Sequence, residues 1–292
     1  MEILNEKPAH VTENKEIPNQ VIDEVDDFQK QTLPQEGLSP VLDKTTDSGG
    51  KKRKILGPVD FFDYNFVSNH FWLKLLAPFA KGILKLGWDI RFEGMENIPK
   101  DQDCIFMPNH VSHFDGPLVI VGAASHVRGS FDIIGDEKLF NNKWFNHLLD
   151  RFNAFPVRKN SKDMWIVDYA IKRCRKNSML WFPEGQRHKN PSINKLNPGK
   201  LGSGMLAHST TNAIIPVFIS GAEFAMPVGR RLRYGKGLRS IKILVRYGKP
   251  VDIEDLRNEP TSKENSKTIL DRIMNAIEEL RPAGPYRDQS RR

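Results

Sequence analysis

Cysteine is scarce in this sequence, and targeting signals are missing. The 292 residues include only Cys104 and Cys174, which cannot build a disulfide framework and do not form a CxxC pair for zinc or redox chemistry. This usage fits a reducing, cytosolic compartment. The first 30 residues are acidic and lack a basic start followed by an apolar run. We therefore expect no signal peptide and no transit peptide.

Signatures of nucleic-acid binding are also missing, although the chain is basic. There is no zinc-finger spacing, no aromatic RNA-binding signature and no basic helix with heptads, which argues against nucleic acid as a partner. The net charge is +8, but residues 1–50 hold 11 acidic and 4 basic side chains, so the remainder carries +15. A cationic body favours an acidic membrane surface, a phosphorylated substrate or an acidic carrier protein.

The two ends of the chain have the composition of tails. Residues 1–57 are rich in polar residues, proline and glycine and hold too few apolar residues to offset the entropy of ordering. We expect a disordered acidic tail there, ended by the basic cluster 51–54, and a short basic tail at 283–292.

Residues 58–89 form an apolar segment interrupted by Lys74, Lys81 and Lys85, which are too costly for a lipid-facing span. No transmembrane helix is expected. The lysine spacing places all three on one helical face, and Pro78 predicts a kink or break. The apolar face opposite them either packs on the core or lies on a membrane surface; it comprises Phe71, Trp72, Leu75, Leu76, Phe79, Ile83 and Leu86.

From about residue 90 to residue 282, short apolar runs alternate with helical periods, which predicts an α/β domain with a central mixed sheet flanked by helices. Helices are expected after Ser112, up to about Leu149, near 162–176 and 200–211, and from about Thr261. The expected strands are CIFMP, SFDIIG, AFPV, MLWFP, AIIPVFIS and IKILVRY.

The sequence NHVSHFD follows the predicted strand CIFMP and precedes an apolar helix. Ser112 and Asp115 have the spacing of a capping box, which predicts Ser112 as the N-cap and Asp115 in the first turn. Asp115 could then reach back to His110 and fix its tautomer. A His–Asp pair without a nucleophile is a general base, which suits direct attack of a bound alcohol on an activated acyl group.

Two other interpretations of NHVSHFD stay open at this point. Ser112 and Asp115 could be only a helix cap, with His110 an ordinary loop residue. His110, His113 and Asp115 could instead bind a metal and support hydrolysis. Zinc would require a further ligand at recognisable spacing, and the other histidines show none, so we expect no metal.

The sequence LWFPEGQRHK places polar residues at the end of a predicted strand, where α/β sheets bind ligands. Gly185 permits close backbone approach, and the planar fork of Arg187 matches phosphate oxygens. Arg158, at the end of AFPV, could converge on the same anion.

Together these segments resemble the 1-acylglycerol-3-phosphate O-acyltransferase family of glycerolipid acyltransferases. NHVSHFD matches the NHxSxxD (HX4D) signature of that family, FPEGQR resembles its FPEGTR block, and AFPVRK resembles its arginine-containing block. KLGSGMLA and IIPVFI resemble two later blocks, so the resemblance covers roughly residues 90–250. Gln186 stands where the family usually has threonine, and Pro156 interrupts the second block; both leave the acceptor open.

The resemblance implies specific roles for residues of this chain. His110 would be the base and Asp115 its partner, while Asn109, Ser112, Lys200 and Pro216 would support the site. The acceptor phosphate would be held by Arg158, Glu184, Gly185 and Arg187.

The resemblance also implies the reaction. It would be transfer of an acyl group from acyl-CoA or acyl carrier protein to lysophosphatidic acid, giving phosphatidic acid in phospholipid biosynthesis, with no cofactor. The alternatives are another acceptor, such as glycerol 3-phosphate or another lysophospholipid, and a non-catalytic lipid-binding relative. Because acyl chain and product are lipids, we expect a peripheral membrane protein on the cytoplasmic face, in which 58–89 faces anionic lipid.

Overall fold

A seven-stranded mixed sheet forms the centre of the part of the chain that the computed structural model describes, with the strand order β3-β9-β8-β4-β7-β5-β6. Neighbouring strands are parallel except β8 and β9, which are antiparallel. The strands are β3 (Asp89–Glu93), β4 (Cys104–Pro108), β5 (Ser130–Asp136), β6 (Ala154–Val157), β7 (Asn177–Leu180), β8 (Ala213–Ser220) and β9 (Lys242–Tyr247).

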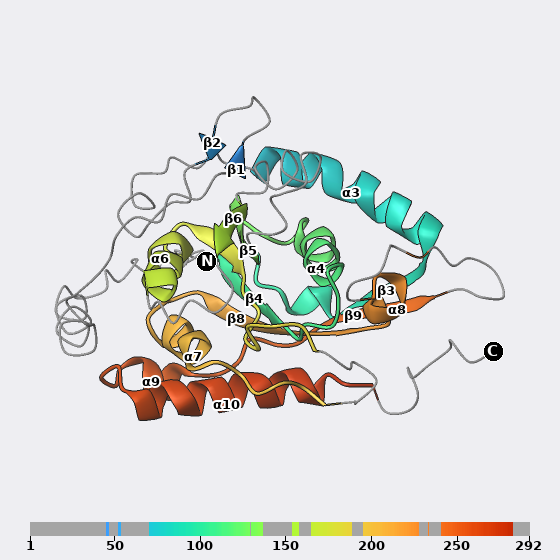
Figure 1. Cartoon of the computed structure of the whole chain (residues 1–292). Coiled ribbons are helices and arrows are strands. Elements are labelled where there is room, and N and C mark those ends of the chain that lie inside the picture. The colour runs from blue at the N-terminus through green and yellow to red at the C-terminus, as the bar shows by residue number, and fades with distance from the viewer. Residues whose placement is uncertain are drawn as a thin grey trace, which may run out of the picture. The chain divides into compact units, whose positions relative to one another are not determined.

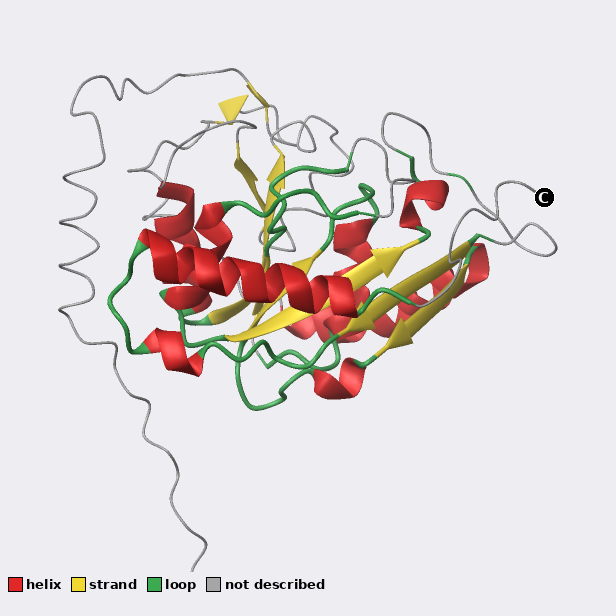
Figure 2. Cartoon of the chain, turned by 90° about the horizontal axis from the view of Figure 1, so that it is seen from below, coloured by secondary structure: helices red, strands yellow, loops and turns green. Residues whose placement is uncertain are grey.

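Helices cover both faces of this sheet (Figures 1 and 2). Helices α3 and α4 lie on one face, and α6, α7 and α10 lie on the other. The helices are α3 (His70–Gly87), α4 (Asp115–Ala123), α6 (Trp165–Cys174), α7 (Leu201–His208), α8 (Ala222–Ala225), α9 (Glu254–Arg257) and α10 (Lys263–Glu279), with a 3-10 turn at η1 (Met95–Asn97). This arrangement confirms the expected α/β class and explains why the central strands are continuous apolar runs.

Side chains of the central strands alternate between two hydrophobic cores. In β4, Cys104 and Phe106 belong to the core under α4, whereas Ile105 and Met107 belong to the core under α6, α7 and α10. All four side chains are fully buried. The period of two in a strand thus divides one apolar run between two layers.

Most elements expected from the sequence are present. The strands β4, β5, β6, β8 and β9 and the helices α6, α7 and α10 match their predicted segments. Strand β3 was not predicted: DIRFE is short, partly exposed and paired only with β9 at the sheet edge. The predicted strand MLWFP was placed too far along the chain. Strand β7 ends at Leu180, and Pro183, which has no N–H, follows in a turn.

Helix α3 differs from the sequence expectation in two respects. It continues through Pro78, so, of the predicted kink or break, the break is wrong. Ala77 is buried and Leu84 packs on the core, whereas six large apolar side chains are exposed. No described helix combines the length and apolar character that a membrane crossing requires. The exposed set is Phe71, Leu75, Leu76, Phe79, Ile83 and Leu86.

Lys81 does not stand with Lys74 and Lys85 on the solvent side of α3. Its ammonium lies 4.9 Å from the centre of the Phe92 ring, and burial lowers its pKa. Lys74 and Lys85 are exposed. The helix therefore turns Lys81 toward the sheet and most of its large apolar side chains outward, so packing on the core does not account for the apolar stripe.

Several expectations fall on residues that are not described. The structure describes residues 45–46, 52–53, 70–128, 130–136, 154–157, 165–188, 195–227, 233 and 241–282. The predicted helix ending near 149, the C-terminal tail and nearly all of 1–57 lie outside these ranges. Within 1–57, β1 (Thr45–Thr46) and β2 (Lys52–Arg53) pair antiparallel, which the sequence did not suggest.

Candidate active site

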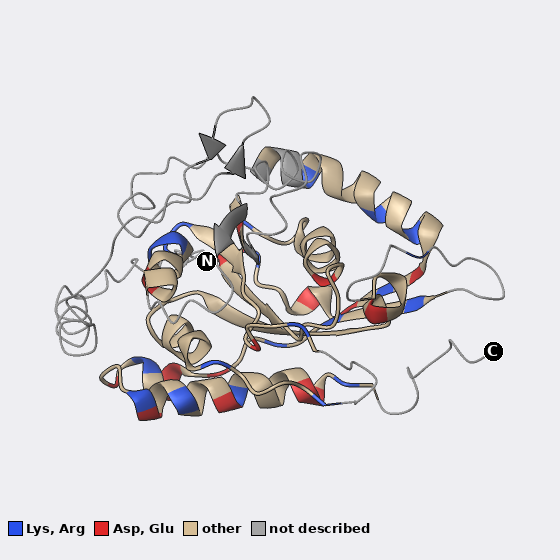
Figure 3. Ribbon diagram, in the orientation of Figure 1, with Lys and Arg blue, Asp and Glu red and all other residues tan. Residues whose placement is uncertain are grey.

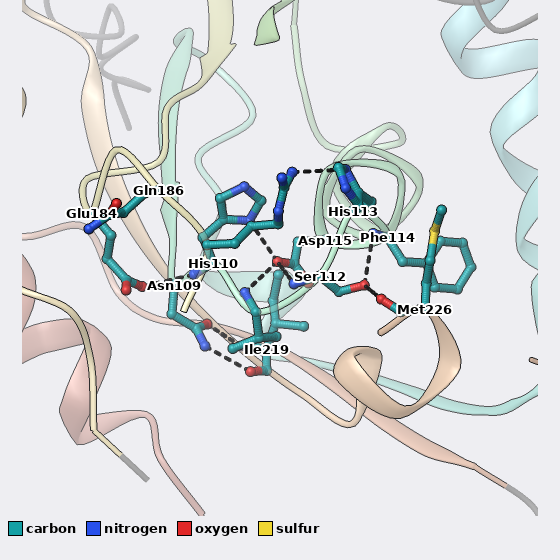
Figure 4. A network of polar contacts seen from close by, with 12 residues as sticks. Asn109, His110, Ser112, His113, Phe114, Asp115, Glu184, Gln186, Ile219 and Met226 are labelled. Atoms are coloured by element: carbon teal, nitrogen blue, oxygen red, sulfur yellow. Dashed lines mark hydrogen bonds and ion pairs between the residues drawn. The ribbon is translucent and has the colours of Figure 1, made fainter. Parts of the chain in front are cut away.

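Three loops meet at the carboxyl ends of the central strands, because they follow three adjacent strands in the order β8-β4-β7. Strand β4 is parallel to both neighbours, so the carboxyl ends of all three point the same way. Residues 109–114 follow β4, residues 181–188 follow β7, and residues from 221 follow β8. Most of the side chains selected from the sequence lie in the first two loops (Figure 4).

The imidazole of His110 is held by Asp115. The distance from His110 Nδ1 to Asp115 Oδ2 is 2.8 Å, the Asp115 side chain is fully buried, and the His110 side chain is 16% exposed. A carboxylate accepts, so Nδ1 carries the hydrogen and Nε2 keeps its lone pair. His110 also stacks on Phe182 with ring centres 3.9 Å apart, which restrains the plane of the imidazole. The geometry leaves Nε2 as the nitrogen able to accept a proton.

Ser112 is not the N-cap that the sequence predicted. Helix α4 begins at Asp115, and Phe114 occupies the N-cap without a side-chain cap. Asp115 Oδ2 does accept the Ser112 N–H at 2.7 Å, as in a capping box, and also the Val111 N–H at 2.7 Å. Ser112 Oγ instead accepts from Phe114 N and donates to Met226 O, because the intervening residues form a turn before the helix.

Asn109 fixes the start of the same loop. Its side-chain amide donates to Ile219 O at 2.9 Å, and its oxygen accepts from Ile219 N at 2.6 Å. This exchange continues the pairing of β4 with β8 beyond Pro108. Asn109 therefore positions the backbone immediately before His110.

Glu184 joins the two loops. One of its oxygens accepts from His110 N at 2.8 Å and the other from Asn197 N at 2.9 Å. Burial raises the pKa of this carboxyl, and the two backbone donors partly offset the rise. Glu184, selected as a phosphate contact, thus holds the backbone of His110 with one oxygen and the backbone of Asn197 with the other.

Gly185 and Lys200 meet at the turn beside Glu184. Gly185 has a φ of 66°, a conformation that favours glycine, and its N–H donates to Phe182 O at 3.0 Å. A Cβ at this position would lie 3.1 Å from Lys200 Cγ, while Lys200 N donates to Pro183 O at 2.8 Å. Lys200 thus packs on the turn and precedes the first residue of α7.

The three remaining selected residues have different placements. Arg187 Nη1 lies 2.9 Å from His113 Nδ1, so the loops after β4 and β7 are joined a second time. Pro216 lies in β8 against Gly248, on the sheet face away from α4. Arg158 lies outside the described residues.

Glu223, in α8 after β8, is a site residue that sequence reasoning missed. Burial raises its pKa to about 7, and the charge of Asp115 adds to the rise. Its Oε2 and the Oδ1 of Asp115 are buried and have no hydrogen-bond partner among the described residues. Only the position of GAEF directly after a β-strand, which parallels NHVSHFD and FPEGQR, hinted at it.

The metal interpretation finds no additional support. Nδ1 of His113 accepts from the Arg187 guanidinium, so this nitrogen is not available to a metal. Within the ranges given above, no three His, Cys, Asp or Glu side chains group as metal ligands would. The contacts of His110 and Asp115 are those of an oriented base.

The arrangement at the carboxyl ends of β4 and β7 is that of a general base beside an arginine, and comparison with known proteins specifies the class of reaction. Residues 89–220 match the family model described as Acyltransferase, a span that runs from β3 to the end of β8 and contains both site loops. Over this span the chain resembles the acyltransferase family, and it is an O-acyltransferase.

Two particular relatives carry a more specific description. The chain is 24% identical over 208 residues to a 1-acyl-sn-glycerol-3-phosphate acyltransferase of Bacillus subtilis (strain 168), a match that covers 71% of this chain and 96% of that protein. It also resembles the crystal structure of the 1-acyl-sn-glycerophosphate (LPA) acyltransferase PlsC from Thermotoga maritima, with a TM-score of 0.55 and 26% identity over 74% of this chain and 83% of the other. The non-catalytic alternative is set aside by these matches.

Proposed function

We propose that this chain transfers a fatty acyl group from acyl-CoA or acyl carrier protein to lysophosphatidic acid, giving phosphatidic acid for phospholipid biosynthesis. The observation that carries the proposal is the 2.8 Å contact of His110 Nδ1 with the buried Asp115, beside a loop that presents Arg187. The names of the two relatives support lysophosphatidic acid as the acceptor.

The chemistry proposed for His110 is general-base catalysis. Nε2 takes the proton of the acceptor hydroxyl as its oxygen attacks the thioester carbonyl carbon. The new C–O bond forms, the C–S bond breaks, and the departing thiolate takes the proton from the imidazolium. Asp115 stabilises the imidazolium through Nδ1, and no covalent enzyme intermediate or cofactor is needed.

The phosphate of the acceptor is proposed to lie against Arg187, with Arg158 as a second contact. A guanidinium presents parallel N–H groups that match two phosphate oxygens. Glu184, Gly185, Asn109 and Ser112 serve this site by holding the loops, through the contacts described above.

A peripheral position on a membrane is the proposed location of the enzyme. Phe79 is 70% exposed and Phe71 66% exposed on α3, with Lys74 and Lys85 nearby on the helix (Figure 3). Apolar side chains combined with lysines bind the interface of a membrane that contains anionic lipid. Such a surface would supply the lipid acceptor and receive the product.

The decisive experiment is transfer of labelled acyl groups from acyl-CoA, and in parallel from acyl carrier protein, to lysophosphatidic acid in vesicles. We expect labelled phosphatidic acid from the wild type and at least about a hundredfold less from a folded His110→Ala variant. Glycerol 3-phosphate and other lysophospholipids are tested as competing acceptors. Equal activity of the His110→Ala variant would refute the proposed base, and a preference for another acceptor would refute lysophosphatidic acid.

A further inference from the structure

The contact of Arg187 with His113 fixes the direction of a hydrogen bond. Arg187 Nη1 lies 2.9 Å from His113 Nδ1. A guanidinium stays protonated and has no acceptor atom, so Nη1 donates and Nδ1 must accept. His113 therefore meets Arg187 with the lone pair of Nδ1, and it stands two residues before Asp115, in the loop that also carries His110.

The hydrogen bond to His113 uses Nη1 of the guanidinium and leaves the Nε and Nη2 edge for another partner. Arg187 Nε is buried and has no hydrogen-bond partner among the described residues. Nε and Nη2 form the side-on fork that matches two oxygens of one anion. Elsewhere in this chain Arg173 uses that same edge on Asp132, with Nε 2.7 Å from Oδ2 and Nη2 3.0 Å from Oδ1.

A buried N–H without a partner is costly, so its occurrence beside the proposed base points to a ligand that completes it. An oxyanion with two oxygens would fill the fork of Arg187 as Asp132 fills that of Arg173. Glu184 does not fill it: its two oxygens accept the backbone N–H groups of His110 and Asn197, and Arg187 Nε stays without a partner in the described part of the chain.

We propose that His113 is a positioning residue for the acceptor phosphate: it accepts from Nη1 and thereby holds the Nε and Nη2 edge of Arg187 toward that phosphate. The inference rests on the proposed function, since it needs a phosphorylated acceptor, and it adds a role for a side chain that has none in the acyl-transfer step. His113 acts through Arg187 and does not touch the reacting hydroxyl.

The test compares two substitutions that differ in one property. His113→Asn keeps an acceptor close to the position of Nδ1, whereas His113→Leu has a similar size and no acceptor. His126→Leu, after α4, is the matched control outside the site. Each variant is assayed for kcat and for the KM of lysophosphatidic acid, after far-UV circular dichroism and the thermal midpoint have verified folding.

We expect His113→Leu to raise the KM about tenfold or more, as for loss of a hydrogen bond to a charged group, with kcat within about threefold of the wild type. His113→Asn and His126→Leu should keep a KM near the wild-type value. In an Arg187→Lys background, which lacks the fork, His113→Leu should have little further effect on KM.

Three results would overturn the proposal: an unchanged KM in His113→Leu, an equal defect in His113→Asn, or an undiminished His113→Leu effect in the Arg187→Lys background. Failure of the proposed function is visible in the wild type alone, as absence of transfer to lysophosphatidic acid. The variants are then compared with whichever phosphorylated acceptor the wild type uses, and if it uses none the inference falls too.

Discussion

A single oxygen of Asp115 accepts from the His110 imidazole and from the backbone N–H groups of Val111 and Ser112. The same atom therefore shapes the loop and orients the base. Because the side chain is fully buried, water cannot replace it in either role.

Replacing Asp115 with Asn should lower kcat by about 10²–10⁴, because a neutral amide lacks the negative charge that stabilises the imidazolium. The KM for the acceptor should change much less, since the phosphate contacts lie in another loop. Steady-state kinetics at saturating donor test this. Asp271→Asn, on exposed α10, is the control, and a kcat within threefold of the wild type in Asp115→Asn would contradict the assignment.

Glu223 predicts a pH dependence of stability. Its pKa is raised from 4.5 to about 7, so between these values the unfolded chain loses the proton while the folded chain keeps it. The free energy of unfolding then falls as pH rises through this window, by at most about 3 kcal/mol. Glu223→Gln should remove that fall and gain stability relative to the wild type at pH 8.

Urea unfolding of the wild type and Glu223→Gln at pH 5 and pH 8 measures this difference. Glu264→Gln, in the exposed first turn of α10, is the matched control and should follow the wild type at both pH values. An equal change in the free energy of unfolding between pH 5 and pH 8 for wild type and Glu223→Gln would show that the carboxyl titrates normally in the folded protein.

At the scale of elements, α7 and α10 approach closely because Gly204 has no side chain. A Cβ at this position would fall on the carbonyl oxygen of Ser266. Gly204→Ala should lower the free energy of unfolding by about 1–3 kcal/mol, since backbone must move apart. Gly82→Ala in α3, where a Cβ meets nothing within 4 Å, is the control and should be neutral or stabilising. Thermal unfolding of both variants and of the wild type measures the effect. A thermal midpoint of Gly204→Ala equal to that of the wild type would mean that the two helices can move apart without loss of stability.

The outward face of α3 gives a second prediction for an element. Phe79→Asp replaces a 70% exposed aromatic residue and should weaken sedimentation with phosphatidylglycerol-containing vesicles roughly tenfold or more, without lowering stability. Asn275→Asp adds the same charge on exposed α10 and should bind as the wild type does. Unaltered vesicle binding by Phe79→Asp would argue that α3 faces something other than lipid.

At the scale of the whole molecule, charge is distributed unevenly: the chain after residue 50 carries +15. This charge sets how membrane binding responds to salt. Binding to anionic vesicles should weaken as salt is raised from 0.05 to 0.5 M, because the Debye length falls from about 14 to about 4 Å. Binding to purely zwitterionic vesicles should be weaker and nearly independent of salt. Equal salt dependence on both vesicle types would contradict attraction by lipid charge.

The sequence by itself determined the α/β class, most strands and helices, and the pairing of His110 with Asp115. These features are local. A strand whose side chains are buried on both faces of the sheet appears in the sequence as an uninterrupted apolar run, and a carboxylate five residues after a histidine reaches back across one turn. Where propensity and turn chemistry competed, as at Ser112 and at the end of β7, the boundaries were misplaced.

Only the tertiary structure decided the contacts between loops. Glu184 meets His110, and Arg187 meets His113, because β7 pairs with β4, and no spacing in the sequence encodes that neighbourhood. Glu223 enters the site for the same reason, through β8. The orientation of α3 was likewise beyond the sequence, since the periodicity of an apolar stripe is the same whether the stripe faces a core or the outside.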